Sequence, residues 1–219
     1  MKNIELEQQF QSIYGFVKNK LEKAPGCHDF DHTLRVLKNA EILAKQIPGA
    51  RIEIIRLAAL LHDIARPEEM SAKGQLCHAE QGAELCIALL KKHSLSDEDI
   101  KLISECIRCH RFRGNGPRPQ SLEAKIIYDA DKLDSIGAIG IGRAFHFAGR
   151  ENARVHNSKE EAVNSEPYSR DDSAYREYLV KLQHVPDKML TEPGRKLASS
   201  RAEFMHNFFI QLENETKTF

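Results

Sequence analysis

The residues best suited to chemistry are an adjacent histidine and aspartate, His62 and Asp63, at the end of the most apolar stretch of the chain. That stretch, Ile52 to Ile64, is apolar on nearly every side, which predicts a helix buried against several neighbours. Burying a charge without pairing or coordination is costly, so both residues need hydrogen bonds or a bound ion. A histidine upstream and an aspartate downstream could complete a metal site with this pair.

Two further segments place candidate ligands on the inner faces of predicted helices. In a helix expected over Phe30 to Ile47, His32 lies on the apolar stripe that faces the core. In a second helix, which Ser121 can cap, Asp131 lies on the inner face and Asp134 follows about one turn later. These side chains are therefore predicted to point inward.

The four inward residues offer two imidazoles and two carboxylates: His32, His62, Asp63 and Asp131. Such a mixed nitrogen and oxygen set suits a divalent ion such as Mn, Fe, Co, Ni, Zn or Mg, with positions left for water and substrate. The alternative is that the histidine and aspartate pair only caps a helix or forms an internal hydrogen bond. Convergence of all four side chains distinguishes the two interpretations.

The order and spacing of these residues resemble the HD-domain superfamily of metal-dependent phosphohydrolases. Three stretches are similar to one bacterial and archaeal branch of small, single-domain members: HDFDHTLRV (28–36), LLHDIARP (60–67) and EAKIIYDADKLDSIGAIGIGR (123–143). The stretch TEPGRKLASSRAEFM (191–205) resembles the closing helix of that branch. The resemblance implies an all-α helical bundle that forms one compact domain over residues 1–219, with the metal-site core at 28–143.

The rest of the chain also reads as helical, and no segment shows a convincing strand alternation. The polar stretch at about 150–172 has no apolar period and is predicted to be a mobile loop. Helices over 173–213 would close the bundle. A loop rich in Gly, Pro and Arg is predicted at 111–120.

Composition limits the partners of this protein. The 219 residues are 41% hydrophobic, enough for one substantial core, and the formal net charge is zero, which gives no field to hold a nucleic acid polymer. The chain shows neither a secretion signal nor a membrane span, and its five cysteines are best read as reduced thiols. We expect a soluble cytoplasmic protein, monomer or homodimer, that uses no membrane.

Five more residues are candidates for catalysis or substrate binding. Lys132 and Arg66 adjoin the predicted ligands and could contact substrate phosphates, although ordinary ion pairing at a helix end is the alternative. The resemblance implies that His78 and His110 either bind a second metal or contact phosphate, and we favour one tightly held ion with a functional role for both histidines. His28 could orient a ligand, meet the substrate or only help to begin a helix.

The general base and the exact substrate stay open at this point. Asp134, Glu80 and metal-bound hydroxide are the candidates for the base, and the two carboxylates could instead support the ligands. The resemblance implies a nucleotide substrate, with pyrophosphate or phosphate released from a nucleoside triphosphate. Among the divalent ions, manganese is favoured. The alternatives are a cyclic-nucleotide phosphodiesterase, a non-catalytic nucleotide sensor and a di-iron oxygenase on the same fold.

Overall fold

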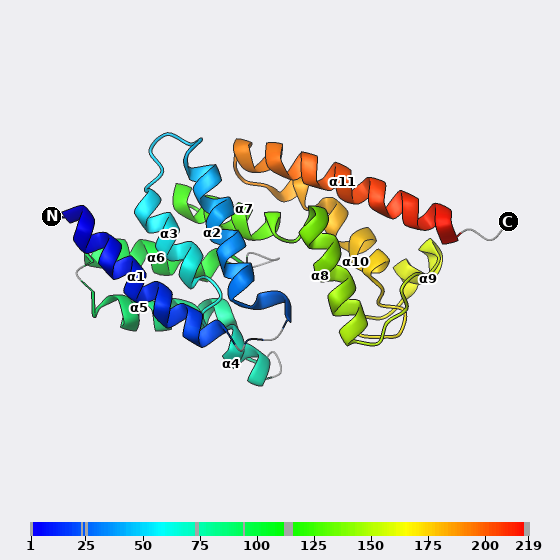
Figure 1. The fold of residues 1–219 in the computed structure, drawn as a ribbon, viewed down its shortest axis with the longest axis horizontal. Coiled ribbons are helices and arrows are strands. Elements are labelled where there is room, and N and C mark those ends of the chain that lie inside the picture. The colour runs from blue at the N-terminus through cyan, green and yellow to red at the C-terminus, as the bar shows by residue number, and fades with distance from the viewer. Residues whose placement is uncertain are drawn as a thin grey trace. The chain divides into compact units, whose positions relative to one another are not determined.

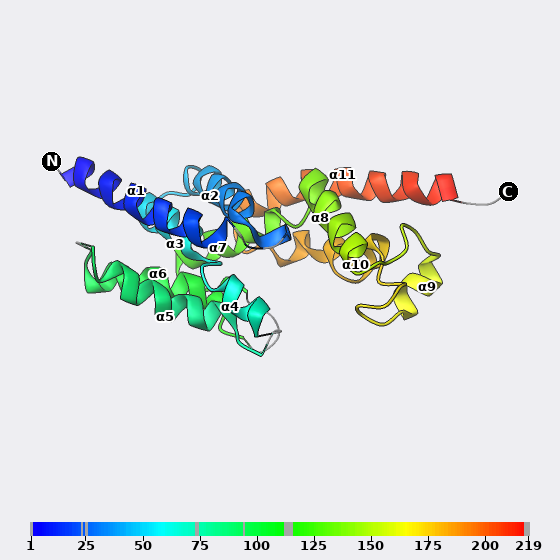
Figure 2. The same ribbon diagram turned by 60° about the horizontal axis from the view of Figure 1, so that its bottom comes forward.

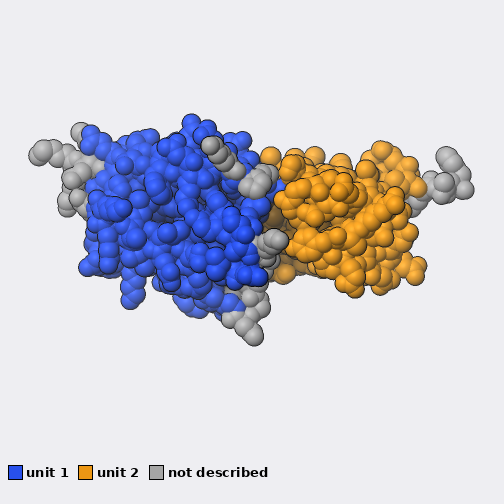
Figure 3. Space-filling model, turned by 90° about the horizontal axis from the view of Figure 1, so that it is seen from below, with its two compact units in different colours: residues 1–131 blue, residues 132–219 orange. Residues whose placement is uncertain are grey.

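The computed structural model describes residues 2–22, 24, 26–72, 75–93, 95–111 and 116–216. Helices dominate this part of the chain and none of its residues lies in a strand, which confirms the predicted all-α class. The chain forms two compact units, residues 1–131 and 132–219 (Figure 3). Helix α7 (Leu122–Leu133) crosses the boundary between them. The single domain expected from the sequence therefore stays a prediction.

Unit 1 is built from two pairs of neighbouring helices. Helix α2 (Phe30–Ala44) packs beside α3 (Ile52–Leu61), and α5 (His78–Leu90) packs beside α6 (Asp97–Cys109) (Figures 1 and 2). Because α3 also contacts α6, the two pairs share one core. The unit also contains α1 (Lys2–Leu21), the 3-10 turn η1 (Gly26–His28) and the short helix α4 (Arg66–Ser71).

Local sequence explains both ends of α2. The side chain of Asp29 accepts a hydrogen bond of 3.0 Å from the backbone N–H of His32, which satisfies a donor that the first helical turn leaves free. The helix ends at Ala44, three residues before the predicted Ile47, and turns follow as far as Gly49. Gly49 has a φ of +81°, a left-handed conformation that favours glycine.

Helix α3 confirms the predicted burial but is shorter than the apolar run. Seven of its ten residues are buried, and they come from all sides of the helix. The helix ends at Leu61, and residues 62–65 form a turn that leads into α4. The prediction of a helix through Ile64 was therefore wrong at its end. His62 and Asp63 lie in this turn, and both are buried.

Unit 2 is built around α8 (Gly137–Arg150) and α11 (Glu192–Thr216), which pack against each other. Helix α10 (Ala174–Val180) contacts α8, and the shorter elements are α9 (Lys159–Asn164), η2 (Leu182–His184) and η3 (Pro186–Lys188) (Figure 1). Helices α10 and α11 correspond to those expected over 173–213. Among all helices of the described residues, none has the length and hydrophobicity needed to cross a membrane.

The segment at 150–172, predicted to be a mobile loop, contains helix α9 and an ordered hydrogen-bond network. Ser158 and Glu161 form a capping box at the start of α9. Asn157 is 1% exposed, and its amide donates a hydrogen bond of 2.9 Å to the carbonyl oxygen of Asp171. These contacts give the segment a defined structure, and its mobility stays a prediction. Part of the loop predicted at 111–120, residues 112–115, lies outside the described residues.

Candidate metal centre

The four predicted ligands come together within unit 1. His32 lies on α2, His62 and Asp63 lie in the turn after α3, and Asp131 lies on α7. His32 Nε2 is 3.2 Å from His62 Nε2, 3.6 Å from Asp131 Oδ1 and 3.7 Å from Asp63 Oδ2. The ligand atoms of His32, His62 and Asp131 all lie within 4.8 Å of one another. A single cation could contact all of these atoms after small shifts in the side chains.

The backbone orients His62 for this role. Its side chain is fully buried, and Nδ1 lies 2.7 Å from the carbonyl oxygen of Ala59. Because a carbonyl oxygen only accepts hydrogen bonds, Nδ1 carries the proton, and the lone pair of Nε2 faces His32. Burial lowers the pKa of His62 to about 3. The imidazole is therefore neutral near pH 7, as a metal ligand must be.

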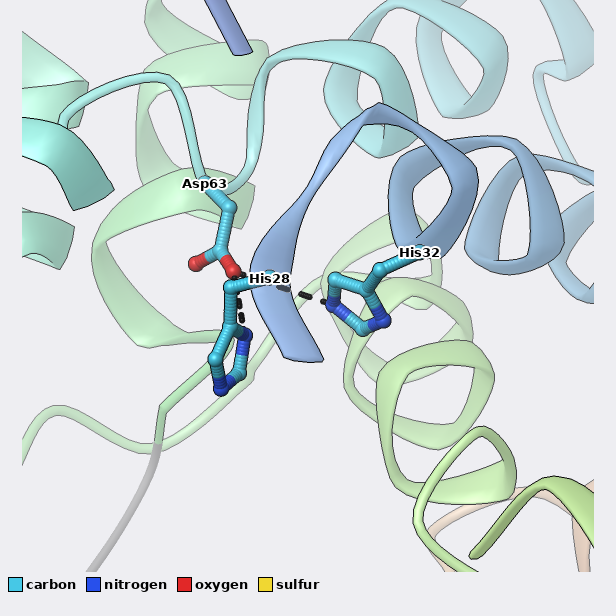
Figure 4. A group of neighbouring side chains, drawn as sticks. All are labelled: His28, His32 and Asp63. Carbon is cyan, nitrogen blue, oxygen red and sulfur yellow. Dashed lines mark hydrogen bonds and ion pairs between the residues drawn. The ribbon is translucent and has the colours of Figure 1, made fainter. Parts of the chain in front are cut away.

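Asp63 is 1% exposed and its two oxygens face different sets of histidines. Oδ2 lies 2.9 Å from His28 Nδ1 and 3.7 Å from His32 Nε2 (Figure 4). Oδ1 lies 3.2 Å from His78 Nε2 and 3.5 Å from His110 Nε2. Asp63 thus joins the candidate ligand group around His32 to a second group of three: Asp63, His78 and His110.

The charge on Asp63 is maintained despite burial. Burial opposes ionisation, but the guanidinium of Arg66 and the hydrogen bond from His28 hold the pKa of Asp63 well below its usual range. Arg66 Nε lies 3.4 Å from Asp63 Oδ2. Burial also lowers the pKa of His28 to about 4, although Asp63 favours its protonated form. The cluster therefore combines an ionised Asp63 with two imidazoles, those of His28 and His62, whose pKa values are lowered.

The second group leaves a buried acceptor unsatisfied. Asp63 Oδ1 accepts no hydrogen bond. His110 Nδ1 lies 2.6 Å from the carbonyl oxygen of Ile107, so it donates its proton there and the Nε2 lone pair faces inward. His78 Nε2 and His110 Nε2 are 3.2 Å apart. A buried carboxylate oxygen beside two converging imidazole nitrogens offers a divalent cation a mixed set of oxygen and nitrogen ligands.

Sequence reasoning missed two residues of the cluster, Glu69 and Arg111. Glu69 on α4 binds Arg66, Arg111 and His78 at distances of 2.5, 2.7 and 2.9 Å. Burial opposes ionisation of Glu69, but its hydrogen bonds with His78 and Arg66 lower its pKa to about 2. Two sequence signals could have found these residues. Glu69 follows Arg66 by three positions at the start of a helix, and Arg111 directly follows His110.

The structure places the remaining predicted residues as follows. His28 and Arg66 join the cluster, since Arg66 Nη2 lies 3.3 Å from His28 Nδ1. Lys132 is the residue after Asp131 on α7 and belongs to unit 2. Asp134, also in unit 2, is 1% exposed and accepts a hydrogen bond of 2.7 Å from Arg143. Glu80 has a 51% exposed side chain and pairs with Arg108 at 2.9 Å on the surface of unit 1.

Comparison with known proteins identifies related sequences and structures. The chain matches the HD domain family over residues 29–136. It is 32% identical to the uncharacterized protein YpgQ of Bacillus subtilis over an alignment of 211 residues. The alignment covers 95% of this chain and 94% of YpgQ. The crystal structure of YpgQ in complex with ADP superimposes with a TM-score of 0.74, at 29% identity and 96% coverage of both chains. A HD-superfamily hydrolase from Bacillus thuringiensis gives the same TM-score at 28% identity, over 96% of this chain and 97% of that one.

Proposed function

The chain belongs to the HD-domain family, and we propose that it is a phosphohydrolase that uses a divalent metal ion to hydrolyse phosphoester or phosphoanhydride bonds. The observation that carries this proposal is the convergence of His32, His62, Asp63 and Asp131 in unit 1. These four residues would hold one ion tightly, with manganese favoured. When bound, such an ion lowers the pKa of a coordinated water and draws in a phosphate oxygen.

The residues around the ligands would bind the substrate phosphate. Arg66 is a permanent cation in contact with Asp63 and His28, and its side chain is 16% exposed. It would neutralise charge on a substrate phosphate, as phosphoryl transfer requires. His28, with a side chain that is 31% exposed, would donate or accept a hydrogen bond at the same place. Lys132 is proposed as a further phosphate contact.

We propose that the substrate is a nucleotide, most specifically a nucleoside triphosphate that loses pyrophosphate or phosphate. The support is the related YpgQ, which was crystallised in complex with ADP. Arg66 and His28 supply groups that recognise the phosphate part of any nucleotide. The base and the sugar would be selected by pocket walls that these residues do not form.

The second group of three, Asp63, His78 and His110, is proposed to take a further divalent ion with lower affinity. It offers three protein ligands, one of which the first ion shares, so it should bind more weakly than the group of four. The free lone pairs at Asp63 Oδ1 and His110 Nε2 favour an ion here over a direct contact with phosphate, whose oxygens are also acceptors.

A substrate panel tests the proposed function. Purified protein is assayed with nucleoside triphosphates, diphosphates and monophosphates and with cyclic dinucleotides, each with added Mn, Mg, Co or Ni. We expect metal-dependent hydrolysis of a triphosphate, with the released phosphate or pyrophosphate identified by ³¹P NMR. The variant His62→Ala, purified in parallel, should be inactive, which excludes a contaminating phosphatase.

Other outcomes of the panel would favour the alternative functions. Turnover of cyclic dinucleotides alone would identify a phosphodiesterase, and binding of nucleotide without turnover under every metal would identify a sensor. Consumption of oxygen by protein purified anaerobically with iron would identify an oxygenase. Each of these results would refute the proposed triphosphate hydrolase.

A further inference from the structure

Glu69 is the most highly connected residue near the candidate site that the proposed function leaves without a role. It lies on α4, is 8% exposed and receives contacts on both carboxylate oxygens. Oε2 lies 2.5 Å from Arg66 Nη1 and 2.9 Å from His78 Nδ1, and Oε1 lies 2.7 Å from Arg111 Nη1. Because Arg111 holds one oxygen, the other stays directed at His78 and Arg66.

The Nδ1 atom of His78 has two neighbours of opposite chemistry. Glu69 Oε2, at 2.9 Å, is a carboxylate oxygen that can only accept a hydrogen bond. Arg66 Nη1, at 3.2 Å, belongs to a guanidinium that can only donate one. If Nδ1 is protonated it donates to Glu69, and if it is not protonated it accepts from Arg66. These two arrangements correspond to the two tautomers of a neutral imidazole.

The tautomer determines what the other side of the His78 ring can bind. Nε2 lies 3.2 Å from Asp63 Oδ1 and 3.2 Å from His110 Nε2. With a proton on Nε2, His78 would donate a hydrogen bond to Asp63 Oδ1 or His110 Nε2. Its Nε2 would then have no lone pair for a metal ion. Without that proton, three lone pairs converge, and a cation is the species that satisfies them.

We propose that Glu69 is a positioning residue that holds His78 with its proton on Nδ1, so that the Nε2 lone pair is directed into the second group as a ligand. The same carboxylate oxygen accepts a hydrogen bond from Arg66 Nη1. This inference rests on the proposed function, which assigns a metal ion to Asp63, His78 and His110. Carboxylates behind ligating histidines have this effect in many metal sites.

The tautomer can be measured without metal, substrate or turnover. In protein labelled with ¹⁵N-histidine and freed of metal by a chelator, long-range ¹H–¹⁵N correlation spectra show which ring nitrogen of His78 carries the proton, with His78→Gln used to assign the signals. We expect the Nδ1–H form in the wild type and the Nε2–H form in Glu69→Ala. The milder Glu69→Gln should give a larger Nε2–H fraction than the wild type. A wild-type His78 with its proton on Nε2 would overturn the proposal even if Glu69→Ala failed to fold.

A manganese titration separates this inference from the proposed function. Isothermal calorimetry of the wild type should show a tight and a weaker class of site. Glu69→Ala should weaken the second class by about 10- to 100-fold and leave the first near its wild-type affinity. The matched control is Glu68→Gln, which removes the neighbouring glutamate of α4 that pairs with Lys20 and should change neither class. If Glu69→Ala lost manganese affinity equally at both classes of site, or kept wild-type affinity at the second class, a positioning role for Glu69 would be contradicted. A wild type that binds no manganese would instead refute the proposed function itself.

Discussion

Both compact units contain buried polar side chains, and one example from each shows a different way of satisfying them. In unit 2, Asn157 is 1% exposed, its amide donates to the carbonyl oxygen of Asp171, and its own oxygen accepts a hydrogen bond of 2.6 Å from Ser173. In unit 1, Asp63 is equally buried, yet its Oδ1 accepts no hydrogen bond and faces the ring nitrogens of His78 and His110.

The difference in hydrogen bonding distinguishes Asn157, a structural polar group, from Asp63, which is placed to bind a ligand. Buried polar groups in folded proteins are almost always hydrogen-bonded, because an unpaired one costs free energy. Asn157 follows that rule through its own chain, whereas Asp63 Oδ1 has no hydrogen-bond partner and faces ring nitrogens that could bind a cation with it. Burial alone therefore does not identify a binding site. The useful signal is a buried acceptor without a hydrogen bond that lies beside other potential ligand atoms.

The largest effect should come from removing the unsatisfied carboxylate. Asp63→Ala removes a ligand from both proposed groups, so manganese affinity and hydrolysis should fall together. Each should fall by more than about 100-fold, because loss of a residue that only supports a ligand already costs up to about 100-fold. Metal content is measured by atomic emission and turnover by phosphate release. Circular dichroism should show nearly unchanged helical content. Normal turnover in a metal-free variant would refute metal-assisted hydrolysis.

Metal binding should stabilise the two units unequally. Manganese at 100 times its dissociation constant stabilises a folded protein by about 2.7 kcal/mol, which corresponds to a rise in Tm of about 5–10 °C for a chain of this length. Hydrogen exchange should slow around residues 28–66 more than around 157–176. Chelator should reverse both effects, and Asp63→Ala should show neither. Uniform protection of both regions would contradict the assignment of the metal to unit 1.

A change in unit 2 should affect stability without affecting metal. Asp134→Asn replaces a buried carboxylate that accepts a hydrogen bond from Arg143, so we expect a loss of about 1.5–3 kcal/mol in the free energy of unfolding. Urea denaturation measures this loss. Manganese affinity, measured by calorimetry under conditions where the variant is folded, should stay near the wild-type value. A large loss of affinity with little loss of stability would instead support the sequence-based hypothesis that Asp134 supports the ligands or acts as a base.

The smallest effect is expected at the boundary between the units. Asp131 is the last residue of unit 1 and Lys132 is the first of unit 2, and both lie on α7. Lys132→Ala should lower kcat/KM by about 10-fold, equivalent to about 1.4 kcal/mol, because a cation near the phosphate is lost. Metal content should stay normal. Unchanged kcat and KM would mean that Lys132 only forms an ion pair.

Much of the fold followed from local patterns. Ser121 was predicted to start a helix, and in the structure its side chain accepts a hydrogen bond from the backbone N–H group of Ala124. The apolar run at 52–64 correctly predicted a buried helix. Its end was misplaced because an apolar run records burial, and all four residues of the turn at 62–65 are buried, like most of the helix before it.

The candidate ligands were predictable for a similar reason, whereas their surroundings were not. His32 and Asp131 lie on apolar stripes that face the core, so their inward direction could be read from spacing alone. Glu69 gave no such signal, because an acidic residue in the first turn of a helix is usually explained by the helix dipole. Its contacts with His78 and Arg111 join residues that are distant along the chain.

Periodicity and motifs of adjacent residues were enough to predict the all-helical class, the inward direction of the four candidate ligands and the family. The position of Asp63 between two groups of histidines, and of Glu69 beside His78 of the second group, could be seen only once the helices were packed together. The two kinds of feature differ in the range of the interactions that produce them. Helix formation and capping act within a few residues, while the hydrogen bonds and lone pairs that define a metal site depend on how separate helices pack.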